Sequence, residues 1–523
     1  MTTSERRDAG AVFPTSDADA TKERRRGSAG RQRLSSGPER ASQHRLVAPT
    51  DPVSVAELGR VHFTGIGGAG MSGVARILLA RGVPVSGTDS ADSALLAGLA
   101  ALGARVAVGH DAGHLGDADT LVVSSAIRPG NPELAAARRR GLRVLHRSAA
   151  LAAAMSGRRG AVITGTHGKT TTTSMLTTIL RRAGADPAYV IGGILAETGL
   201  GAEDGRGEVF VAEADESDGS FLNLAPQAAV AVVTCVEADH LDNYASLAEI
   251  EAAFAAFAAR MPPGATLVIC ADDPGCGRLA AAASGTGLRL RRYGCAPDAD
   301  YQVSGIAVTG MTTALTVTTG AGALRPAGAV LPVTNGVPGR HNALNAAAAL
   351  AAAAELGTSA GAVVAGLGAY RGAQRRMEPK GEADGVRVLD SYAHHPTELA
   401  ADLAAAREVA AGGRVIAIFQ PHLFSRTRLF AGEFGAALGL ADEAVVLDVY
   451  PAREDPEPGV TGELVARAVP GGALYLPDAA AAPAAAAGLA KPGDLVLTMG
   501  AGDVTRLGPL IVDVLRARAG EGG

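Results

Sequence analysis

Residues 161–174 read AVITGTHGKTTTTS, an apolar run followed by a glycine-bracketed turn and a Lys-Thr pair at the start of a helical stretch. The apolar run fits the end of a buried strand, and Gly165 and Gly168 let the backbone turn so tightly that its N–H groups converge on an anion. Lys169 then places a positive charge on the β- and γ-phosphates of a nucleotide, and the Thr170 hydroxyl can bind a magnesium ion. The stretch therefore predicts a phosphate-binding loop between a strand and a helix.

This loop differs from the ordinary P-loop, G-x-x-x-x-G-K-[ST], which requires glycine at position 163, where the chain has isoleucine. The shorter form T-G-T-x-G-K-T-T resembles the loop of the Mur ligases and of their folylpolyglutamate synthetase relatives, which activate a carboxylate with ATP. The resemblance implies that ATP is bound by Gly165, Thr166, His167, Gly168, Lys169, Thr170 and Thr171.

Composition sets the broad class of the protein. The 523 residues are 47% hydrophobic, which suits about three domains with buried cores, and the formal net charge of −5 gives no footprint for nucleic acid. Four cysteines without C-x-x-C spacing indicate a reducing compartment. No apolar run approaches a membrane span and the N-terminus lacks a signal peptide, so we expect a cytoplasmic protein that is a monomer or weak homodimer, with no membrane or nucleic-acid partner.

Residues 1–55 form a segment rich in Arg, Ser, Asp and Gly, with scattered prolines and no hydrophobic periodicity. Such a segment cannot bury enough apolar surface to offset the entropy of ordering. We expect a disordered, solvated tail, although the basic cluster Arg24-Arg25-Arg26 can also contact an anionic partner.

A second glycine-rich turn follows the tail, in the sequence VHFTGIGGAGMSGVARILLARG from Val61. Gly65, Gly67 and Gly70 form the dinucleotide fingerprint between a strand and an amphipathic helix, and Asp89 follows a second strand where it can hold a ribose hydroxyl. Taken alone, the pattern indicates an NAD-dependent dehydrogenase. However, the turn requires only a pyrophosphate, so a UDP-sugar satisfies it equally.

Residues 56–155 as a whole resemble the UDP-binding domain of the Mur ligases. Strand-like 121–123 leads into SSAIRPGNPEL, whose serine hydroxyls lie at the carboxyl edge of the sheet, the usual ligand side. The implied UDP-sugar contacts are Gly65, Gly67, Gly68, Gly70, Asp89, Ser124 and Ser125.

Two acid-rich turns follow apolar strands in the next domain, which we place at residues 156–373. Strand-like 208–214 ends in EADESDGSF and strand-like 228–236 ends in EADHLDNY. In a parallel sheet both turns face the nucleotide, and the resemblance assigns magnesium to Thr170 and Glu213 and a second ion to His240. Asp215, Glu216 and Asp239 are not selected. The chain departs from the family pattern at Cys235, where Asn is common.

Residues 301–333 alternate Thr and Val with glycine breaks, which predicts an antiparallel ribbon added to the sheet. The following sequence, PGRHNALNAAAALAAAAELG, predicts a strong helix. The family uses the first turns of this helix beside adenine and phosphates, which implies nucleotide contacts at His341, Asn342 and Asn345; an N-cap cluster without a ligand is the alternative.

The last domain, residues 374–523, alternates strands and helices and is predicted to be a second Rossmann-like α/β unit that binds the amine substrate. RGAQRRMEPKGEADGV (371–386) is interpreted as the hinge. The resemblance assigns Arg376 and Asp390 to the nucleotide, reached when this domain closes and excludes water.

Two signatures in the last domain, DSYAHHPTE (390–398) and FQPHLFSRTR (419–428), are close to those of the alanine-adding branch of the family. His394, His395 and Arg426 are the candidates for binding the amino-acid carboxylate or the developing phosphate. Ser391 and Leu423 replace the Asp and Arg that are common in the family, which weakens any inference that the amino-acid pocket is unchanged.

Together the motifs predict a three-domain α/β enzyme: a Rossmann-like UDP-binding domain, a central P-loop-type ATPase domain with a parallel sheet, and a Rossmann-like C-terminal domain. The resemblance implies an ADP-forming ligase that joins L-alanine to UDP-N-acetylmuramate through an acyl phosphate, with ATP and Mg²⁺. The catalytic candidates are Lys169, Glu213, His240, Arg376 and Asp390.

Three alternatives stay open. A muropeptide ligase that attaches a tripeptide to the same nucleotide shares both glycine turns, so only the third domain separates it. A folylpolyglutamate synthetase has no use for the N-terminal nucleotide fold. A non-enzymatic sensor of NAD or UDP type needs the first glycine turn but not Lys169, Glu213 and His240.

Overall fold

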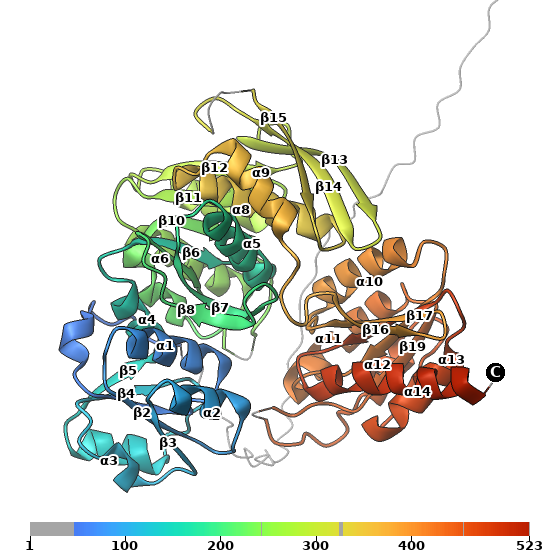
Figure 1. Cartoon of the computed structure of the whole chain (residues 1–523), viewed down its shortest axis with the longest axis horizontal. Coiled ribbons are helices and arrows are strands. Elements are labelled where there is room, and N and C mark those ends of the chain that lie inside the picture. Colours follow the sequence, from blue (N-terminus) through green and yellow to red (C-terminus); the bar gives the residue numbers. More distant parts are fainter. Residues whose placement is uncertain (1–45, 242, 324–327, 453, 522–523) are drawn as a thin grey trace, which may run out of the picture. The chain divides into compact units, whose positions relative to one another are not determined.

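The computed structural model describes residues 46–241, 243–323, 328–452 and 454–521, and the first 45 residues, to which most of the predicted tail belongs, lie outside this range. The described residues form three β-sheets that follow one another along the chain (Figure 1), as the predicted three-domain α/β fold requires. Among these residues, no helix combines the length and the apolar character needed to cross a bilayer.

The first sheet is parallel throughout, with strand order β3-β2-β1-β4-β5. Its elements are β1 (Val61–Thr64), α1 (Ala69–Ala80), β2 (Val85–Asp89), α2 (Ala94–Ala101), β3 (Arg105–Val108), β4 (Thr120–Val123), α3 (Pro132–Arg139), β5 (Arg143–His146) and α4 (Arg147–Met155). The predicted glycine turn connects β1 to α1. This is the Rossmann-like arrangement expected of residues 56–155.

A buried carboxylate holds the middle of the first sheet together. Glu133, on α3, is fully buried and accepts hydrogen bonds from Thr64 Oγ1 (2.6 Å) and Thr88 Oγ1 (2.8 Å). Burial alone would raise its pKa, but bonding to His62 and to the two threonines outweighs burial and lowers the pKa to about 2. Glu133 therefore ties α3 to the ends of β1 and β2, on either side of the glycine turn.

The central sheet has strand order β15-β14-β13-β12-β11-β10-β6-β9-β7-β8 among the described residues. Its strands are β6 (Arg159–Thr164), β7 (Ala188–Leu195), β8 (Leu200–Glu203), β9 (Val209–Glu213), β10 (Ala228–Val233), β11 (Thr266–Cys270), β12 (Arg289–Gly294), β13 (Tyr301–Thr309), β14 (Thr312–Thr319) and β15 (Val330–Asn335). The helices are α5 (Lys169–Arg182), α6 (Leu247–Arg260), α7 (Pro274–Ala282), α8 (Arg340–Glu355) and α9 (Ala360–Ala369).

The pairing of the central strands positions the phosphate loop. β6 lies between β10 and β9 and is parallel to both, so the loop after β6 is flanked by the two acid-rich turns, as predicted. β13, β14 and β15 pair antiparallel and form the ribbon expected from the Thr-Val alternation.

The C-terminal sheet has strand order β16-β17-β21-β18-β19-β20. Its elements are β16 (Glu378–Ala383), β17 (Val386–Ser391), α10 (Pro396–Ala410), β18 (Val415–Phe419), α11 (Phe424–Leu438), β19 (Glu443–Leu447), α12 (Glu463–Ala468), β20 (Leu474–Leu476), α13 (Ala482–Leu489), β21 (Leu495–Met499) and α14 (Leu507–Glu521). Within the segment predicted as a hinge (371–386), residues 378–383 form the edge strand β16, which pairs antiparallel with β17.

The apolar cores divide the described residues differently from the sheets. One continuous cluster of buried side chains joins the first and central sheets, and α1 packs against β7 and β8. The C-terminal sheet has separate cores on its two faces. The first two domains therefore share one apolar core, and the third has cores of its own.

Residues 46–50 differ from the prediction of a disordered tail through residue 55. Val47 N donates to Asp218 O (2.8 Å) and Thr50 N donates to Asn223 Oδ1 (2.8 Å). This segment is therefore attached to the first acid-rich turn through Asp218 and to Asn223 just after it, because its backbone finds partners that its composition does not reveal.

Candidate active site

The phosphate loop has the backbone that its glycines require. β6 ends at Thr164, and Gly165 (φ 121°) and Gly168 (φ 82°) adopt the positive φ that side chains disfavour. A Cβ on Gly168 would lie 2.5 Å from Asn345 Oδ1 of α8. The loop therefore needs glycine both for its positive φ angles and for its close contact with α8. Helix α5 begins immediately after it, at Lys169.

Lys169 is enclosed by acceptors. Its Nζ donates to the carbonyls of Gly165 (2.7 Å) and Thr166 (3.1 Å) and to Glu216 Oε1 (2.9 Å). Burial would lower the pKa of this lysine, but the carboxylates of Glu216 and Asp215 outweigh burial and raise it above its usual value. The side chain is therefore a fixed positive charge at the loop.

Thr170 is the meeting point of two predicted catalytic residues. Its hydroxyl donates to Glu213 Oε1 (3.0 Å), and Arg376 Nη2 donates to the same hydroxyl oxygen (3.1 Å). Glu213, at the end of β9, is oriented by Gly192 N, which donates to its second oxygen (2.7 Å). The structure thus brings Thr170, Glu213 and Arg376 together from three separate segments.

His240 lies near Glu216 and Asp239. Its Nε2 is 3.6 Å from Glu216 Oε1 and 3.6 Å from Asp239 Oδ2. Burial would lower the pKa of His240, but the neighbouring Asp239 and Glu216 raise it. Asp239 also accepts from the buried Arg426 (2.6 Å), a side chain of the C-terminal domain.

The side chains around the phosphate loop suit a divalent ion that prefers oxygen ligands. Thr170 and Glu213 present a hydroxyl and a carboxylate in contact with one another, and magnesium needs only one or two protein ligands beside phosphate oxygens. In addition, Glu216 Oε2 is buried without a hydrogen-bond partner. The donor set therefore suits the predicted Mg²⁺.

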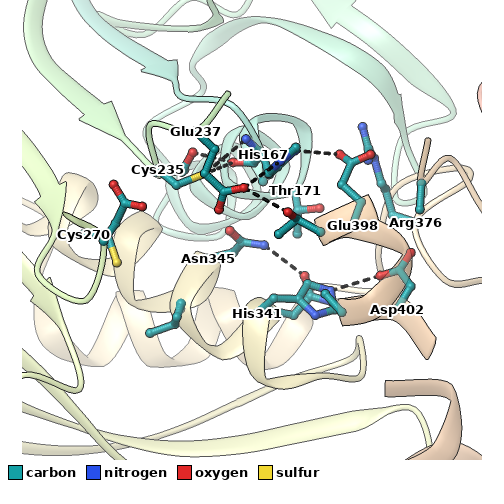
Figure 2. A pocket seen from close by; sticks show the side chains of 18 of the residues that line it. His167, Thr171, Cys235, Glu237, Cys270, His341, Asn345, Arg376, Glu398 and Asp402 are labelled. Carbon is teal, nitrogen blue, oxygen red and sulfur yellow. Dashed lines mark hydrogen bonds and ion pairs between the residues drawn. The ribbon is translucent and has the colours of Figure 1, made fainter. Parts of the chain in front are cut away.

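A cavity of about 320 Å³ lies beside the loop (Figure 2). It is lined by loop and α5 residues, by the predicted helix residues His341, Asn342 and Asn345, and by Arg376 and Glu398 from the C-terminal side. Asn345 accepts from Thr172 Oγ1 (3.3 Å) and donates to Asn342 Oδ1 (3.1 Å). The first turns of α8 thus line the same cavity as the phosphate loop.

Of the site residues predicted in the third domain, some contact the central domain and others bond within their own domain. His395 lies 4.8 Å from the His167 ring, centroid to centroid, and Arg426 reaches Asp239, so both come to the central domain. His394 bonds within its own domain, to Tyr392 O (3.0 Å). Asp390 does not line the cavity, because it is fully buried in β17 and accepts from Thr498 (2.6 Å) and Thr505 (2.7 Å).

The glycine turn of the first sheet has a compact internal structure. Gly65 has φ 80°, Gly68 precedes α1 as its N-cap, and Gly67 N donates to Asp89 Oδ2 (2.9 Å). Asp89 was predicted to hold a ribose hydroxyl, and in this structure one of its oxygens is engaged by the turn. Ser124 and Ser125 follow β4 as expected, and Ser125 donates to Asp218 of the central domain.

Two charged residues near the predicted sites were missed by the sequence analysis. Glu216, set aside there, is the direct partner of Lys169. Arg147, at the start of α4, lies 3.1 Å from where a Cβ on Gly70 would be and donates to Asp215 (2.8 Å). Its position after β5 at the ligand edge of the first sheet is the signal that could have selected it.

Three family profiles cover most of the chain. Residues 60–159 match the Mur ligase family catalytic domain, residues 163–353 the Mur ligase middle domain, and residues 375–502 the Mur ligase glutamate ligase domain. The chain belongs to the Mur ligase family.

Individual Mur ligases match along nearly their whole length. The chain is 58% identical to the UDP-N-acetylmuramate–L-alanine ligase of Thermobifida fusca, over 90% of this chain and 99% of that protein. It is also 58% identical to the ligase of the same name from Kineococcus radiotolerans, over 89% and 98%. The crystal structure of the UDP-N-acetylmuramate–alanine ligase of Thermotoga maritima superposes with a TM-score of 0.73 at 28% identity, covering 88% of this chain and 99% of that one.

Proposed function

We propose that this Mur ligase joins L-alanine to the lactyl carboxylate of UDP-N-acetylmuramate, converting ATP to ADP and phosphate, in peptidoglycan precursor synthesis. The observation that carries the proposal is the set Lys169, Thr170, Glu213 and Arg376 at one phosphate loop. Relatives that bear this activity in their names, at 58% identity over nine-tenths of the chain, support the choice of substrates.

The reaction needs activation because a carboxylate oxygen is too poor a leaving group for amide formation. The carboxylate attacks the γ-phosphorus of ATP, the bond to the bridging oxygen breaks, and ADP leaves an acyl phosphate behind. The amine of L-alanine, having lost a proton from its ammonium form, then attacks the acyl carbon, and phosphate departs as the amide forms. Charge on the phosphoryl group and on the tetrahedral oxyanion must be stabilised in these steps.

Individual residues take roles that follow from their contacts. Lys169, whose charge is fixed by burial among acceptors, neutralises the β- and γ-phosphates. Arg376, which reaches Thr170 from the C-terminal side, adds a second cation when that domain is closed. We expect Thr170 and Glu213 to hold one magnesium ion and His240 a second; when bound, magnesium neutralises charge on the transferred phosphoryl group.

The first and third domains are proposed to bind the two substrates that are joined. The turn Gly65–Gly70 at the start of α1 is proposed to hold the pyrophosphate of the UDP-sugar. His395 and Arg426, which reach the central domain from α10 and α11, are proposed to bind the amino acid. The role of Asp390 is less direct than predicted, because its carboxylate holds β17 to β21 and to Thr505.

We expect the protein to be a monomer or a weak homodimer. All reactants are water-soluble, and we place the reaction in the cytoplasm. Sedimentation of the purified protein would measure the oligomeric state.

Phosphate release with ATP, UDP-N-acetylmuramate and a panel of amino acids and tripeptides tests the function. We expect release that depends on L-alanine, with glycine and serine weaker because one methyl group contributes about 1–3 kcal/mol of discrimination in an apolar pocket. Turnover with a tripeptide but not with L-alanine would assign a muropeptide ligase instead. Tight binding of NADH would contradict our assignment of the glycine turn.

A further inference from the structure

A cluster of ligand-type side chains lies at the boundary of the central and C-terminal domains and has no part in the proposed reaction as a cluster. His167, Glu237 and His395 each offer one nitrogen or oxygen atom, and these three atoms lie within 4.8 Å of one another. His167 belongs to the phosphate loop, Glu237 follows β10, and His395 is the N-cap of α10. Figure 2 shows His167 and Glu237 side by side at the edge of the cavity.

Two ring nitrogens of this cluster have no hydrogen-bond partner. His167 Nε2 and His395 Nε2 are both buried and unpaired, and His395 is only 5% exposed. Buried polar atoms are rarely left unpaired, because a buried donor or acceptor without a hydrogen bond destabilises the fold. Two such atoms facing one carboxylate therefore indicate a missing ligand rather than a packing role.

The distances suit a metal ion better than a hydrogen bond. His167 Nε2 is 3.6 Å from Glu237 Oε2, too far for a hydrogen bond. Two ligands that are each about 2.0–2.1 Å from a tetrahedral zinc ion are separated by roughly 3.3 Å. A small inward movement of the side chains would complete such a site.

The surrounding groups have the arrangement found around metal-bound histidines. His167 Nδ1 is 3.3 Å from Glu398 Oε1, so a carboxylate can hold the proton on Nδ1 and leave Nε2 free to coordinate. Glu237 Oε2 also accepts from Thr397 Oγ1 (3.0 Å). Thr397 N donates to His395 Nδ1 (3.4 Å), so metal binding through His395 Nε2 requires the ring proton to move from Nε2 to Nδ1 and this long hydrogen bond to be lost.

Charge also favours a cation. Among the described residues no lysine or arginine is paired with Glu237 or Glu398, whose charged partners are histidines alone. A divalent ion would balance both carboxylates. Imidazole and carboxylate ligands together suit Zn²⁺ and its neighbours among the transition metals more than Mg²⁺.

We propose that His167, Glu237 and His395 form a site for a Zn²⁺-class ion that links the phosphate loop to the start of α10. Three protein ligands leave one position open to water, as in other open zinc sites. Because the ion contacts both domains, its binding holds the C-terminal domain against the loop and slows turnover. The site is separate from the proposed magnesium ligands, and its occupancy is measured without substrates.

The test titrates the metal-free, full-length protein with Zn²⁺ against a chromogenic chelator and with Co²⁺ by visible absorption. We expect one ion per chain, with the intense bands of tetrahedral Co²⁺. Glu237→Gln and, separately, His395→Gln should weaken Zn²⁺ binding by at least about tenfold. Thermal melting of each variant without metal checks folding, and two independent variants keep the test valid if one misfolds.

Two control variants distinguish this site from other histidine-carboxylate neighbours. His114→Gln changes an imidazole 3.8 Å from Glu133 in the first domain, and His240→Asn changes one beside Glu216. Both should retain Zn²⁺ binding. Absence of stoichiometric binding, binding unaffected by Glu237→Gln and His395→Gln, or loss of binding in either control would overturn the proposal.

Discussion

Lys169 supplies a positive charge that is held in place at the phosphate loop. It is surrounded by two loop carbonyls and Glu216, so its charge is already oriented before a triphosphate arrives. Catalysis of phosphoryl transfer depends mainly on such preorganised charge.

Lys169→Ala should reduce phosphate release at least about 100-fold, because the charge that Lys169 places on the phosphates is lost. Binding of UDP-N-acetylmuramate, measured by calorimetry, should persist, since the proposed pyrophosphate site is on another sheet. Lys491→Ala, at an exposed position of the C-terminal domain, is the matched control and should keep full activity. Loss of both activity and UDP-sugar binding in Lys169→Ala would show that the first glycine turn is misassigned.

Glu133→Gln should reveal a pH-dependent contribution to stability. The folded-state pKa of Glu133 is lowered from 4.5 to about 2, so its ionised form stabilises the fold above about pH 4.5, and this contribution is lost as pH falls toward 2. The shift corresponds to roughly 3 kcal/mol at neutral pH. Urea unfolding of both proteins should show the largest difference near pH 7 and a shrinking one below pH 4.5; a constant difference would contradict this account.

Single residues show how far the sequence could define the site. The glycines, Lys169 and Thr170 were predictable because a phosphate loop is a local motif. The acid-rich turn EADESD was predicted too, and Glu213, selected with Thr170 as a magnesium ligand, does contact the Thr170 hydroxyl. Motif spacing cannot tell which further carboxylate turns toward Lys169, and in the structure it is Glu216. The nucleotide role of Asp390 stays a prediction, and the sequence could not show that its carboxylate is buried against Thr498 and Thr505 from distant segments.

At the scale of elements, the junction of β6, the phosphate loop and α5 depends on close approach of α8. Gly168 and Asn345 are in such contact that any side chain at 168 would collide with the amide. The loop and the α8 residues therefore act as one nucleotide-binding unit.

Gly168→Ala should disrupt this unit, and Gly157→Ala provides the control. Both positions have φ 82°, but a Cβ on Gly157 would meet nothing within 4 Å, whereas one on Gly168 would lie 2.5 Å from Asn345 Oδ1. Backbone strain should cost each variant about 1 kcal/mol, while only Gly168→Ala should also lose ATP affinity by more than about tenfold. Equal ATP affinity in the two variants, measured by nucleotide titration, would contradict the crowding argument.

Elements with strong apolar patterns were predictable, and weak edge strands were not. The runs before both acid-rich turns formed β9 and β10, and the Thr-Val alternation formed the ribbon. β16 has the polar sequence EPKGEA, which carries no strand pattern, and only its pairing with β17 makes it a strand.

At the scale of the whole molecule, the apolar cores predict how the chain unfolds. The first and central sheets share one buried cluster, whereas the C-terminal sheet has its own. Scanning calorimetry should therefore resolve two transitions, with the first two domains melting together. A variant lacking the buried partner of Asp239, Arg426→Met, should separate the transitions further, and a single transition in both proteins would contradict the division.

The N-terminal segment should matter only from residue 46 onward. Deleting residues 1–45 should leave kcat within about twofold, because their composition predicts a disordered tail and such termini rarely shape a site. Deleting residues 1–52 also removes the hydrogen bonds of Val47 and Thr50 to the loop at 218–223, each worth about 1 kcal/mol. Melting temperature and kcat of the two truncations measure this difference, and identical melting curves would contradict it.

The cavity beside the loop has walls from two domains, with His167 and Asn345 on one side and Glu398 and Asp402 on the other. A small molecule that fills this cavity would contact both walls, hold the two domains in one arrangement and inhibit the enzyme. Substitutions that weaken the binding of such a molecule would therefore arise in more than one part of the sequence, around His167, around Asn345 and around Glu398 and Asp402.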